Sequence, residues 1–374
     1  MKDLDSVSIE QLGGDVFLNV SRTIFTGDVL RVEDHRQNRF ENPQTINVTW
    51  LRRLLAPAFE NALSVPSVDV SLTETSHPVT RLDIYQMHGI PFSTAGWASV
   101  YRSRLCERAE QALIDVFDRG VVVSFELPPY LKDIFDRNCI PYIDFTIYPL
   151  RFLQDCVLGA RTNVAALRQS MEEHAVPEDV FQTEARLLSA RASRRMQGSA
   201  AIPPGSAVFL GQTEFDASLV SNGIHAGQID VELALREMVE DFGTVFYKRH
   251  PHSKPNSKLD SFLDGEPRIN VLERNIYDLL GSGFVSVAGS LSSSVLWEAP
   301  YFGVTPKRFL NNGDHFACIG AERSWRQYIP LLPYAITERF WRSIIHGDSF
   351  KPSPWDPNFL SGSLKHSLNM TWGR

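Results

Sequence analysis

The sequence has no long hydrophobic run: none of its apolar stretches approaches the ~20 residues that a membrane-spanning helix needs. Its first ten residues, MKDLDSVSIE, lack the apolar core of a signal peptide. Cysteine is also scarce, and the four that occur form neither a CxxC pair nor a zinc-binding spacing. We therefore expect buried thiols in a cytoplasmic protein, without disulfides, at Cys106, Cys139, Cys156 and Cys318.

An excess of positive charge is absent too. The 374 residues contain 37 Lys and Arg against 44 Asp and Glu, a formal net charge of −7. This balance argues against nonspecific binding to duplex nucleic acid, and a hydrophobic content of 43% excludes a disordered chain. The sequence has no internal repeat or low-complexity block, and its length corresponds to two or three domains of about 150 residues.

Strand-like and helix-like segments alternate along the first half, which favours an α/β fold. The apolar, β-branched run at 121–125 predicts a strand buried on both faces, and the prolines that follow it end the strand. A helix at 130–138 and a strand at 140–147 complete a strand–helix–strand unit. Helices are also expected at 107–119 and over 160–198, the latter broken at Pro177.

The second half predicts a doubly wound parallel sheet, because short strands alternate with short helices. The expected strands are 207–210, 244–247, 269–272 and 284–287, and the expected helices are 231–242, 276–280, 294–302 and 338–345. A Gly-, Pro- and Ser-rich stretch at 198–206 reads as a linker. We therefore expect domains at 1–200 and 201–340, with a tail at 341–374 that packs back on the first.

Three polar loops follow strands of this second half. Because ligands bind beyond the carboxyl ends of the strands in an open parallel sheet, these loops form the expected binding site. They are GQTEFDAS at 211–218, KRHPHSK at 248–254 and AGSLSSS at 288–294.

Two of these loops suit an anion. The serines lead into an expected helix, whose N-terminal N–H groups and dipole favour phosphate, although one serine that simply caps the helix is an equal alternative. Pro251 fixes the chain direction after His250, and a solvated surface turn is the alternative for that loop. The basic loop concentrates positive charge through Lys248, Arg249, His250, His252 and Lys254.

Carboxylates follow buried strands in both halves. Glu214 and Asp216 come directly after the strand at 207–210, where a carboxylate can act as a nucleophile or a general base. The alternative for Asp216 is the N-cap of a helical turn. Glu126 follows the strand at 121–125, and a structural acid at a strand end is its alternative.

Two αβα domains with a phosphate site in the second and a carboxylate in each are the layout of GT-B glycosyltransferases. In that fold class two Rossmann-like domains face a central cleft, with the nucleotide sugar on the C-terminal half and the acceptor on the N-terminal half. No DxD-like motif stands out, so we expect a reaction without a metal ion or other cofactor. Cationic side chains and helix dipoles would then stabilise the leaving phosphate.

The motifs also resemble a family. GQTEFDAS, KRHP at 248–251 and GSLSSSVLWEA at 289–299 are similar to segments of the retaining β-Kdo transferases of bacterial capsule, O-antigen and lipopolysaccharide assembly. The stretch SFELPPYLKDIFDRNCIPYIDFTIYPLRFLQD at 124–155 resembles their acceptor-side signature. The resemblance covers residues from about 120 to 300.

The resemblance implies a donor, CMP-β-Kdo, and roles for particular residues. Asp216 would be the catalytic nucleophile that forms a covalent Kdo intermediate, and His250 a catalytic and phosphate-binding residue. Glu126 is the further catalytic candidate, as the base for the acceptor hydroxyl or as a hydrogen-bond anchor for the acceptor sugar. The donor-binding set would be Gln212, Lys248, Arg249, His250, Pro251, Ser290, Ser292, Ser293, Ser294 and Glu298.

Alternative functions stay open at this point. A CMP-sialic-acid transferase or another metal-independent GT-B enzyme has the same fold and phosphate site, and a non-catalytic glycan-binding protein is the third reading. The expected partners are CMP-β-Kdo and a lipid-linked or oligosaccharide acceptor, and not a nucleic acid. The expected location is the cytoplasm, with peripheral association at the inner face of the membrane as an open possibility.

Overall fold

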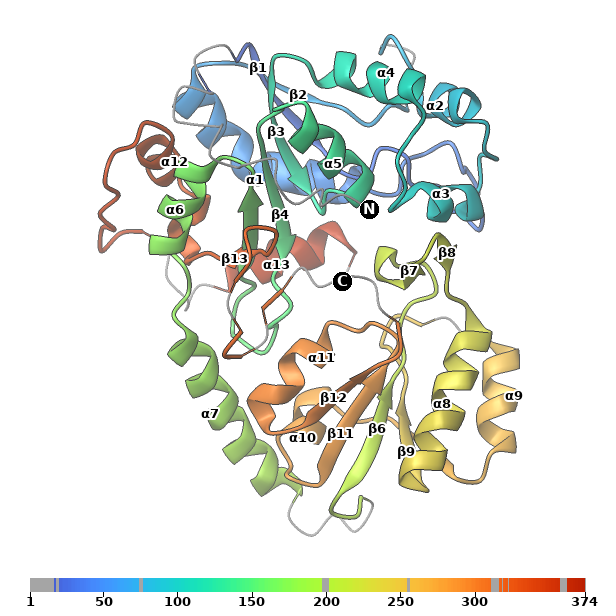
Figure 1. Ribbon diagram of the computed structural model, residues 1–374. Helices are drawn as coiled ribbons and strands as arrows, with labels where there is room; N and C mark the ends of the chain where they lie inside the picture. The colour runs from blue at the N-terminus through green and yellow to red at the C-terminus, as the bar shows by residue number, and fades with distance from the viewer. Residues whose placement is uncertain are drawn as a thin grey trace. The chain divides into compact units, whose positions relative to one another are not determined.

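The structure is a computed structural model that describes residues 17, 20–73, 77–196, 202–253, 256–310, 316–317, 319–321, 323–356 and 362–373. The chain divides into two compact units, both of α/β type (Figure 1). The first unit contains the chain up to Tyr148, Gln154–Val176 and the chain from Arg323 onward. The second contains Pro149–Leu153 and Pro177–Glu322.

The first unit is built on a six-stranded sheet in the order β13-β5-β4-β3-β1-β2. Strands β1 to β4 are parallel, whereas β5 and β13 run antiparallel to their neighbours. Its strands are β1 (Arg22–Thr26), β2 (Ser67–Asp69), β3 (Gly120–Phe125), β4 (Tyr142–Ile147), β5 (Leu158–Thr162) and β13 (Ile329–Pro330). Its helices are α1 (Thr45–Leu63), α2 (Arg81–His88), α3 (Thr94–Val100), α4 (Glu107–Phe117), α5 (Pro129–Arg137), α6 (Ala165–Glu173), η6 (Pro333–Ile336), α12 (Glu338–Ile345) and α13 (Ser363–Thr371).

Helices cover both faces of this sheet. On one face, α1, α6, α12 and α13 contribute apolar side chains to a core shared with β3, β4 and β5. On the other face, Phe117 of α4 packs edge-on against Phe135 of α5, which in turn contacts Tyr142 of β4. Strands β3 and β4 are buried along their whole length, as the apolar run at 121–125 predicts.

The second unit has a five-stranded, all-parallel sheet in the order β10-β9-β6-β11-β12. A small antiparallel hairpin, β7–β8, stands apart from it. Its strands are β6 (Ser206–Leu210), β7 (Val220–Ser221), β8 (Ile224–His225), β9 (Val245–Lys248), β10 (Ile269–Leu272), β11 (Val285–Ser290) and β12 (Thr305–Arg308). Its helices are α7 (Glu178–Met196), η4 (Ala217–Leu219), α8 (Gln228–Phe242), α9 (Ser257–Gly265), α10 (Ile276–Leu280), α11 (Val295–Glu298) and η5 (Ala299–Phe302).

The alternation of side chains along β6 explains the layering of this unit. Ala207 and Phe209 pack with side chains of α8 and α9, and Val208 and Leu210 pack with side chains of α7, α10 and α11. A central parallel strand buried on both faces is apolar along its buried length, as β6 is from Ala207 to Leu210. Two Rossmann-like α/β units are therefore confirmed, and so is the doubly wound sheet of the second half.

One secondary-structure prediction is wrong. The segment 158–162 is the strand β5 and not the start of a helix, because it pairs antiparallel with β4 and buries Arg161 against Asp144. The helical propensity of residues 160–162 is outweighed by the pairing of this segment with β4 in the sheet.

The units also divide at other positions than 200 and 340. Helix α7 packs against α10 and so lies in the second unit, and the change of unit falls between Val176 and Pro177. From Arg323 onward the chain belongs to the first unit.

The cysteines are less buried than the sequence suggests. Cys139 is exposed, while Cys106 and Cys156 are partly exposed, because all three lie at helix ends or in a loop rather than inside the sheets. Among the residues that the structure describes no disulfide occurs, and Cys318 lies outside them. In the same part of the chain, no helix combines the length and the apolar character that crossing a bilayer requires.

Trp341 of α12 fastens the C-terminal tail into the first unit. Its ring is fully buried, lies 4.8 Å from the ring of Phe59 in α1 and 5.6 Å from that of Phe145 in β4, and its indole N–H donates to the Ala335 carbonyl at 2.6 Å.

We expect Trp341→Ala to lower the free energy of unfolding of this unit by about 3–5 kcal/mol, measured by urea denaturation. Trp355→Ala is the control, because Trp355 is 94% exposed, and equal losses in the two variants would contradict this packing.

Candidate functional site

The topology of the second sheet marks one place for a ligand. Strand β6 comes first in the chain, β9 and β10 follow on one side of it, and β11 and β12 on the other. The direction of winding therefore reverses between β6 and β11, and ligands of open α/β sheets bind at such a switch point, beyond the carboxyl ends of the strands. The loops at this position are 211–218 after β6 and 291–294 after β11.

The side-chain amide of Gln212 joins these two loops. Its Oε1 accepts from the backbone N–H of Ser292 at 2.8 Å and from the Ser290 hydroxyl at 3.0 Å, and its Nε2 donates to the Ser292 hydroxyl at 3.0 Å. Because a backbone N–H only donates, the contact with Ser292 fixes which end of the amide is the oxygen. The Ser292 hydroxyl also donates to Ser218 at 3.0 Å, so both ends of the 211–218 loop are tied to the serines.

The basic loop after β9 is attached to the same point. The N–H of Gly211 donates to the Lys248 carbonyl at 2.9 Å, and the Ser253 hydroxyl donates to the Gln212 carbonyl at 3.4 Å. A Cβ atom at residue 211 would lie 2.6 Å from the Tyr247 hydroxyl and 3.3 Å from the backbone nitrogen of His250, so this close approach requires glycine. The three polar loops predicted from the sequence thus meet at the end of β6.

His250 is held in a defined orientation. It is partly exposed, and its Nδ1 accepts from the backbone N–H of His252 at 3.2 Å. In the neutral imidazole this contact leaves the proton on Nε2, which then becomes the donor toward a ligand. Pro251, between the two histidines, is exposed in the turn.

The two other cations of the loop differ from each other. Arg249 forms an ion pair with Asp260 of α9 at 2.5 Å, and both side chains are about one-third exposed. The ammonium of Lys248 donates to the carbonyl of Arg249 at 3.3 Å. Lys254 lies outside the described residues.

Asp216 serves as an N-cap, which was the alternative that the sequence left open. Its Oδ1 accepts from the backbone N–H of Ser218 at 2.9 Å and begins the turn η4, and the side chain is exposed. A carboxylate that accepts a backbone N–H bond is held in one orientation, which an attacking nucleophile also requires. Asp216 is therefore a cap in the structure, and its role as nucleophile stays a prediction.

The serines after Ser292 lead into a very short helix. Helix α11 has only four residues, so its dipole is smaller than the sequence suggested, and Ser294 makes no side-chain cap. The Ser293 hydroxyl accepts from the backbone N–H of Val295 at 3.4 Å, which leaves its own hydrogen directed elsewhere. Any phosphate bound here would depend on hydroxyl groups and nearby cations more than on a helix terminus.

Glu298, predicted to bind the donor, is 1% exposed within α11. Its Oε1 accepts from the backbone N–H of Arg151 at 2.6 Å and from the Tyr277 hydroxyl at 3.1 Å. These contacts attach the segment Pro149–Leu153 to the helices of the second unit. They are those of a structural carboxylate, and donor binding by Glu298 stays a prediction.

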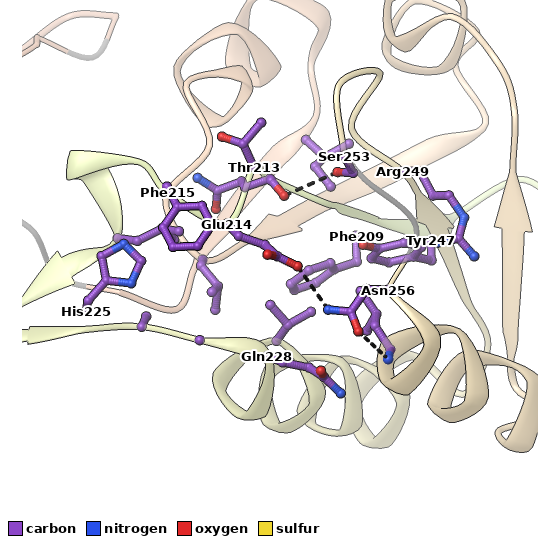
Figure 2. A pocket seen from close by; sticks show the side chains of 18 residues that line it. Phe209, Thr213, Glu214, Phe215, His225, Gln228, Tyr247, Arg249, Ser253 and Asn256 are labelled. Atoms are coloured by element: carbon purple, nitrogen blue, oxygen red, sulfur yellow. Dashed lines mark hydrogen bonds between the residues drawn. The ribbon is translucent and has the colours of Figure 1, made fainter. Parts of the chain in front are cut away.

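A pocket of about 320 Å³ adjoins the Gln212 network, on the side of the sheet covered by α8 and α9 (Figure 2). The rings of Phe209 and Tyr247 lie side by side in it, 6.1 Å apart with 17° between their planes, and burial raises the pKa of Tyr247 to about 12. Phe215 and His225 stack on another wall, 6.2 Å apart. The pocket is mainly apolar and has polar groups at its rim, as small-molecule sites do.

In the first unit, the corresponding switch point lies between β1 and β3. Glu126, directly after β3, is exposed and has a backbone φ of +56°, a conformation that is strained for any residue other than glycine. Its Oε1 accepts from the Thr146 hydroxyl at 3.0 Å. Glu126 is one of several described residues other than glycine with a positive φ, and its catalytic role stays a prediction.

A buried ion pair imposes this conformation. Asp144, fully buried in β4, accepts from Arg161 Nε and from the backbone N–H of Leu127, both at 2.8 Å, and from the Tyr328 hydroxyl at 2.5 Å. Arg161 in turn donates to the Leu127 carbonyl at 3.2 Å. Both polar backbone groups of Leu127 are thus held by one ion pair, and the turn that carries Glu126 is fixed.

Asp28 joins the two loops at this switch point, and the sequence did not single it out. This carboxylate, two residues beyond β1, accepts from the Trp97 indole at 2.7 Å and from the Tyr130 hydroxyl of α5 at 2.8 Å. Burial raises its pKa, against the opposing effect of these hydrogen bonds. Its position after Gly27 at the end of a strand is the one sequence feature that could have pointed to Asp28, because the first hundred residues contain no recognisable motif.

Within the described residues, no group of three or more His, Cys, Asp or Glu side chains is arranged to hold a metal ion.

Comparisons with known proteins give structural neighbours only. No protein-family model matches the chain, and no curated protein matches it. Among solved structures, the chain is similar to Thermosulfurimonas dismutans KpsC described as a beta Kdo 2,7 transferase, at 11% identity and a TM-score of 0.38, over 93% of this chain and 99% of that one. It is also similar to the beta Kdo 2,4 transferase of the same organism's KpsC, at 12% identity and a TM-score of 0.38, over 92% and 97% of the two chains.

The Gln212 network is testable through stability. We expect Gln212→Ala to lower the free energy of unfolding of the second unit by about 1–3 kcal/mol, because the Ser292 N–H loses its acceptor, whereas the Ser290 hydroxyl keeps the Leu210 carbonyl. Chemical denaturation measures the loss. Gln111→Ala removes an exposed amide that donates to Asp115 of the same helix, and it should change stability by less than about 0.5 kcal/mol. A Gln212→Ala protein as stable as this control would show that the two loops do not depend on the amide.

Proposed function

We propose that the protein is a retaining glycosyltransferase that moves Kdo from CMP-β-Kdo to a saccharide acceptor of a bacterial surface polysaccharide. The observation that supports this most is the meeting of three motifs at one point. GQTEFDAS, KRHP and the serine loop follow the neighbouring strands β6, β9 and β11, and hydrogen bonds of Gly211 and Gln212 join all three. These are the segments that resemble the β-Kdo transferases.

In this proposal the phosphate of CMP lies against the serine loop and the basic loop. Ser293 has a hydroxyl hydrogen to donate, and His250 presents Nε2 because Nδ1 is engaged by the backbone. Lys248 supplies positive charge at the end of β9. Hydroxyl and imidazole donors aimed at the leaving phosphate stabilise the charge that develops as the sugar departs.

The first chemical step belongs to Asp216. Its carboxylate attacks the anomeric carbon of Kdo, the bond from that carbon to the phosphate oxygen breaks with its electron pair, and CMP leaves. The product of the step is a Kdo ester of Asp216. The backbone N–H of Ser218 orients the carboxylate for this attack.

The second step returns the sugar to its original configuration. An acceptor hydroxyl attacks the anomeric carbon of the ester, the carboxylate of Asp216 leaves, and a base takes the hydroxyl proton. Glu126, exposed and held rigidly by the Asp144–Arg161 pair, is the proposed base. Two inversions give net retention.

An assay of donor use separates this function from its alternatives. Purified protein is incubated with CMP-Kdo generated in situ and a panel of short saccharides, and CMP release is followed. Consumption of CMP-sialic acid in place of CMP-Kdo would support a sialyltransferase, and no turnover of either donor would support a glycan-binding protein.

The role of Asp216 is tested by a substitution that keeps the cap. Asparagine also caps helical turns, so Asp216→Asn should retain thermal stability while transfer falls by several powers of ten. Mass spectrometry of the intact protein with donor alone should detect one Kdo on the unaltered chain and none on the variant. Asp230→Asn is the matched control, since Asp230 likewise accepts a backbone N–H at the start of α8. Normal transfer by Asp216→Asn would rule out the nucleophile.

The role of His250 is tested by binding. We expect His250→Ala to weaken CMP affinity by about 1.5–3 kcal/mol in calorimetry, because a charge-assisted contact to phosphate is lost. His252→Ala retains the backbone N–H that orients His250, and it should bind CMP as the unaltered protein does. If the two variants bind CMP equally well, His250 has no part in the phosphate site.

A further inference from the structure

We infer that the pocket beside Gln212 is the nucleobase subsite of the donor, and that Glu214 makes it selective for cytosine over uracil. This inference deepens the proposed function, because it assigns residues that would recognise the base of CMP. Its evidence is the pocket's lining, its continuity with the serine loop and the fixed geometry of a carboxylate at its rim.

The lining suits a flat, uncharged ring. The parallel rings of Phe209 and Tyr247 lie on one side, and the stacked pair Phe215 and His225 lies on another. A volume of about 320 Å³ is at the lower end of the range for small-ligand pockets, roughly 300–1,000 Å³. Aromatic side chains stack on a base of any sequence, so they supply affinity without selectivity.

The pocket is continuous with the proposed phosphate site. Gln212 lines the pocket, and the same side chain contacts Ser290 and Ser292. A ligand with a ring in the pocket therefore passes Gln212 and reaches the serine loop with its phosphate. A mononucleotide has this arrangement of parts.

The rim carries a carboxylate whose direction is fixed. The Oδ1 of Asn256 caps α9 by accepting from the backbone N–H groups of Lys258 and Leu259 at 3.2 and 3.3 Å, so its Nδ2 faces Glu214. That nitrogen donates to Oε1 of Glu214 at 3.0 Å (Figure 2). Oε2 of Glu214 has no hydrogen bond within the described residues, and it is an acceptor at the pocket's edge.

A carboxylate acceptor distinguishes the two pyrimidines. Cytosine presents its N4 amino group as a donor, which Asp and Glu accept, whereas uracil presents the O4 oxygen at the same place. With uracil, the O4 oxygen and the Glu214 carboxylate would both be acceptors, so no hydrogen bond could form between them. An acidic sugar is also a poor occupant of this position, because its carboxylate would face Glu214, and the nearby Arg249 is paired with Asp260.

The test uses free nucleosides, which contain neither phosphate nor Kdo. Calorimetry or ligand-observed NMR with the full chain should show cytidine binding about tenfold more tightly than uridine. Glu214→Gln should weaken cytidine about tenfold and remove the preference, while Glu240→Gln, an exposed acid on α8, should change neither affinity. Equal binding of the two nucleosides, or a preference that survives Glu214→Gln, would overturn the inference.

A second pair of variants tests the location of the base without altering the carboxylate. Val231 of α8 lines the pocket, and Val231→Trp should fill it and abolish cytidine binding. Leu233→Trp places the same ring on the exposed face of α8, where Leu233 is 61% exposed, and should bind normally. Cytidine binding by both variants would place the base elsewhere.

Failure of the subsite and failure of the proposed function give different results. If cytidine binds as expected but no CMP-Kdo is consumed, the subsite stands and the transferase function fails. If CMP-Kdo is consumed at an unchanged rate and KM by the Val231→Trp protein, the function stands and the subsite is wrong. Thermal unfolding of each variant confirms that it is folded.

Discussion

The candidate site of the second unit depends on one side-chain amide. At the switch point the chain winds away from β6 in opposite directions, so the loops after β6 and β11 have no shared backbone ladder to hold them together. Gln212 joins the two loops because an amide both donates and accepts. It contacts the backbone N–H and the hydroxyl of Ser292 in the other loop, and the hydroxyl of Ser290 at the end of β11. A carboxylate or an ammonium of similar length could satisfy only one half of these contacts.

In the first unit the two loops at the switch point are also joined by a side chain, but by one of a different kind. There the loops at the switch point are joined by the carboxylate of Asp28, which is buried with Trp97 and Tyr130 around it. A buried and fully bonded carboxylate gives rigidity but has no surface to offer a ligand. The exposed group at this edge is Glu126, and the Asp144–Arg161 pair holds its turn through Leu127. The structural acid and the exposed acid are thus different residues in this unit. In the second unit the partly exposed Gln212 joins the loops and, in the proposed function, also faces the donor.

The sequence predicted the second unit better than the first for a physical reason. Its strands are short apolar runs followed at once by polar loops, so hydrophobic pattern alone located β6, β9, β10 and most of β11, and the topology then brought the loops together. In the first unit the turn after β3 is held by buried polar residues such as Arg161 and Asp144, and no local sequence pattern records their pairing across strands. The same pairing turned an expected helix into β5. The N-cap role of Asp216 could be predicted from the sequence as the alternative to catalysis, because capping depends on residues that are neighbours in the sequence.

The segment 211–218 connects the separate parts of the proposed donor site. Its even-numbered residues are polar and have distinct contacts: Gln212 with the serines, Glu214 with Asn256, and Asp216 with the backbone of Ser218. In the proposed function, Gln212 faces the phosphate side of a single donor, Glu214 its base and Asp216 its sugar. Because they share one short segment anchored at Gly211 and Ser218, a shift of the segment would move all three together. The distance from base to reacting carbon is then set by the backbone of one loop, and a donor with a different spacing between these parts could not satisfy all three contacts at once.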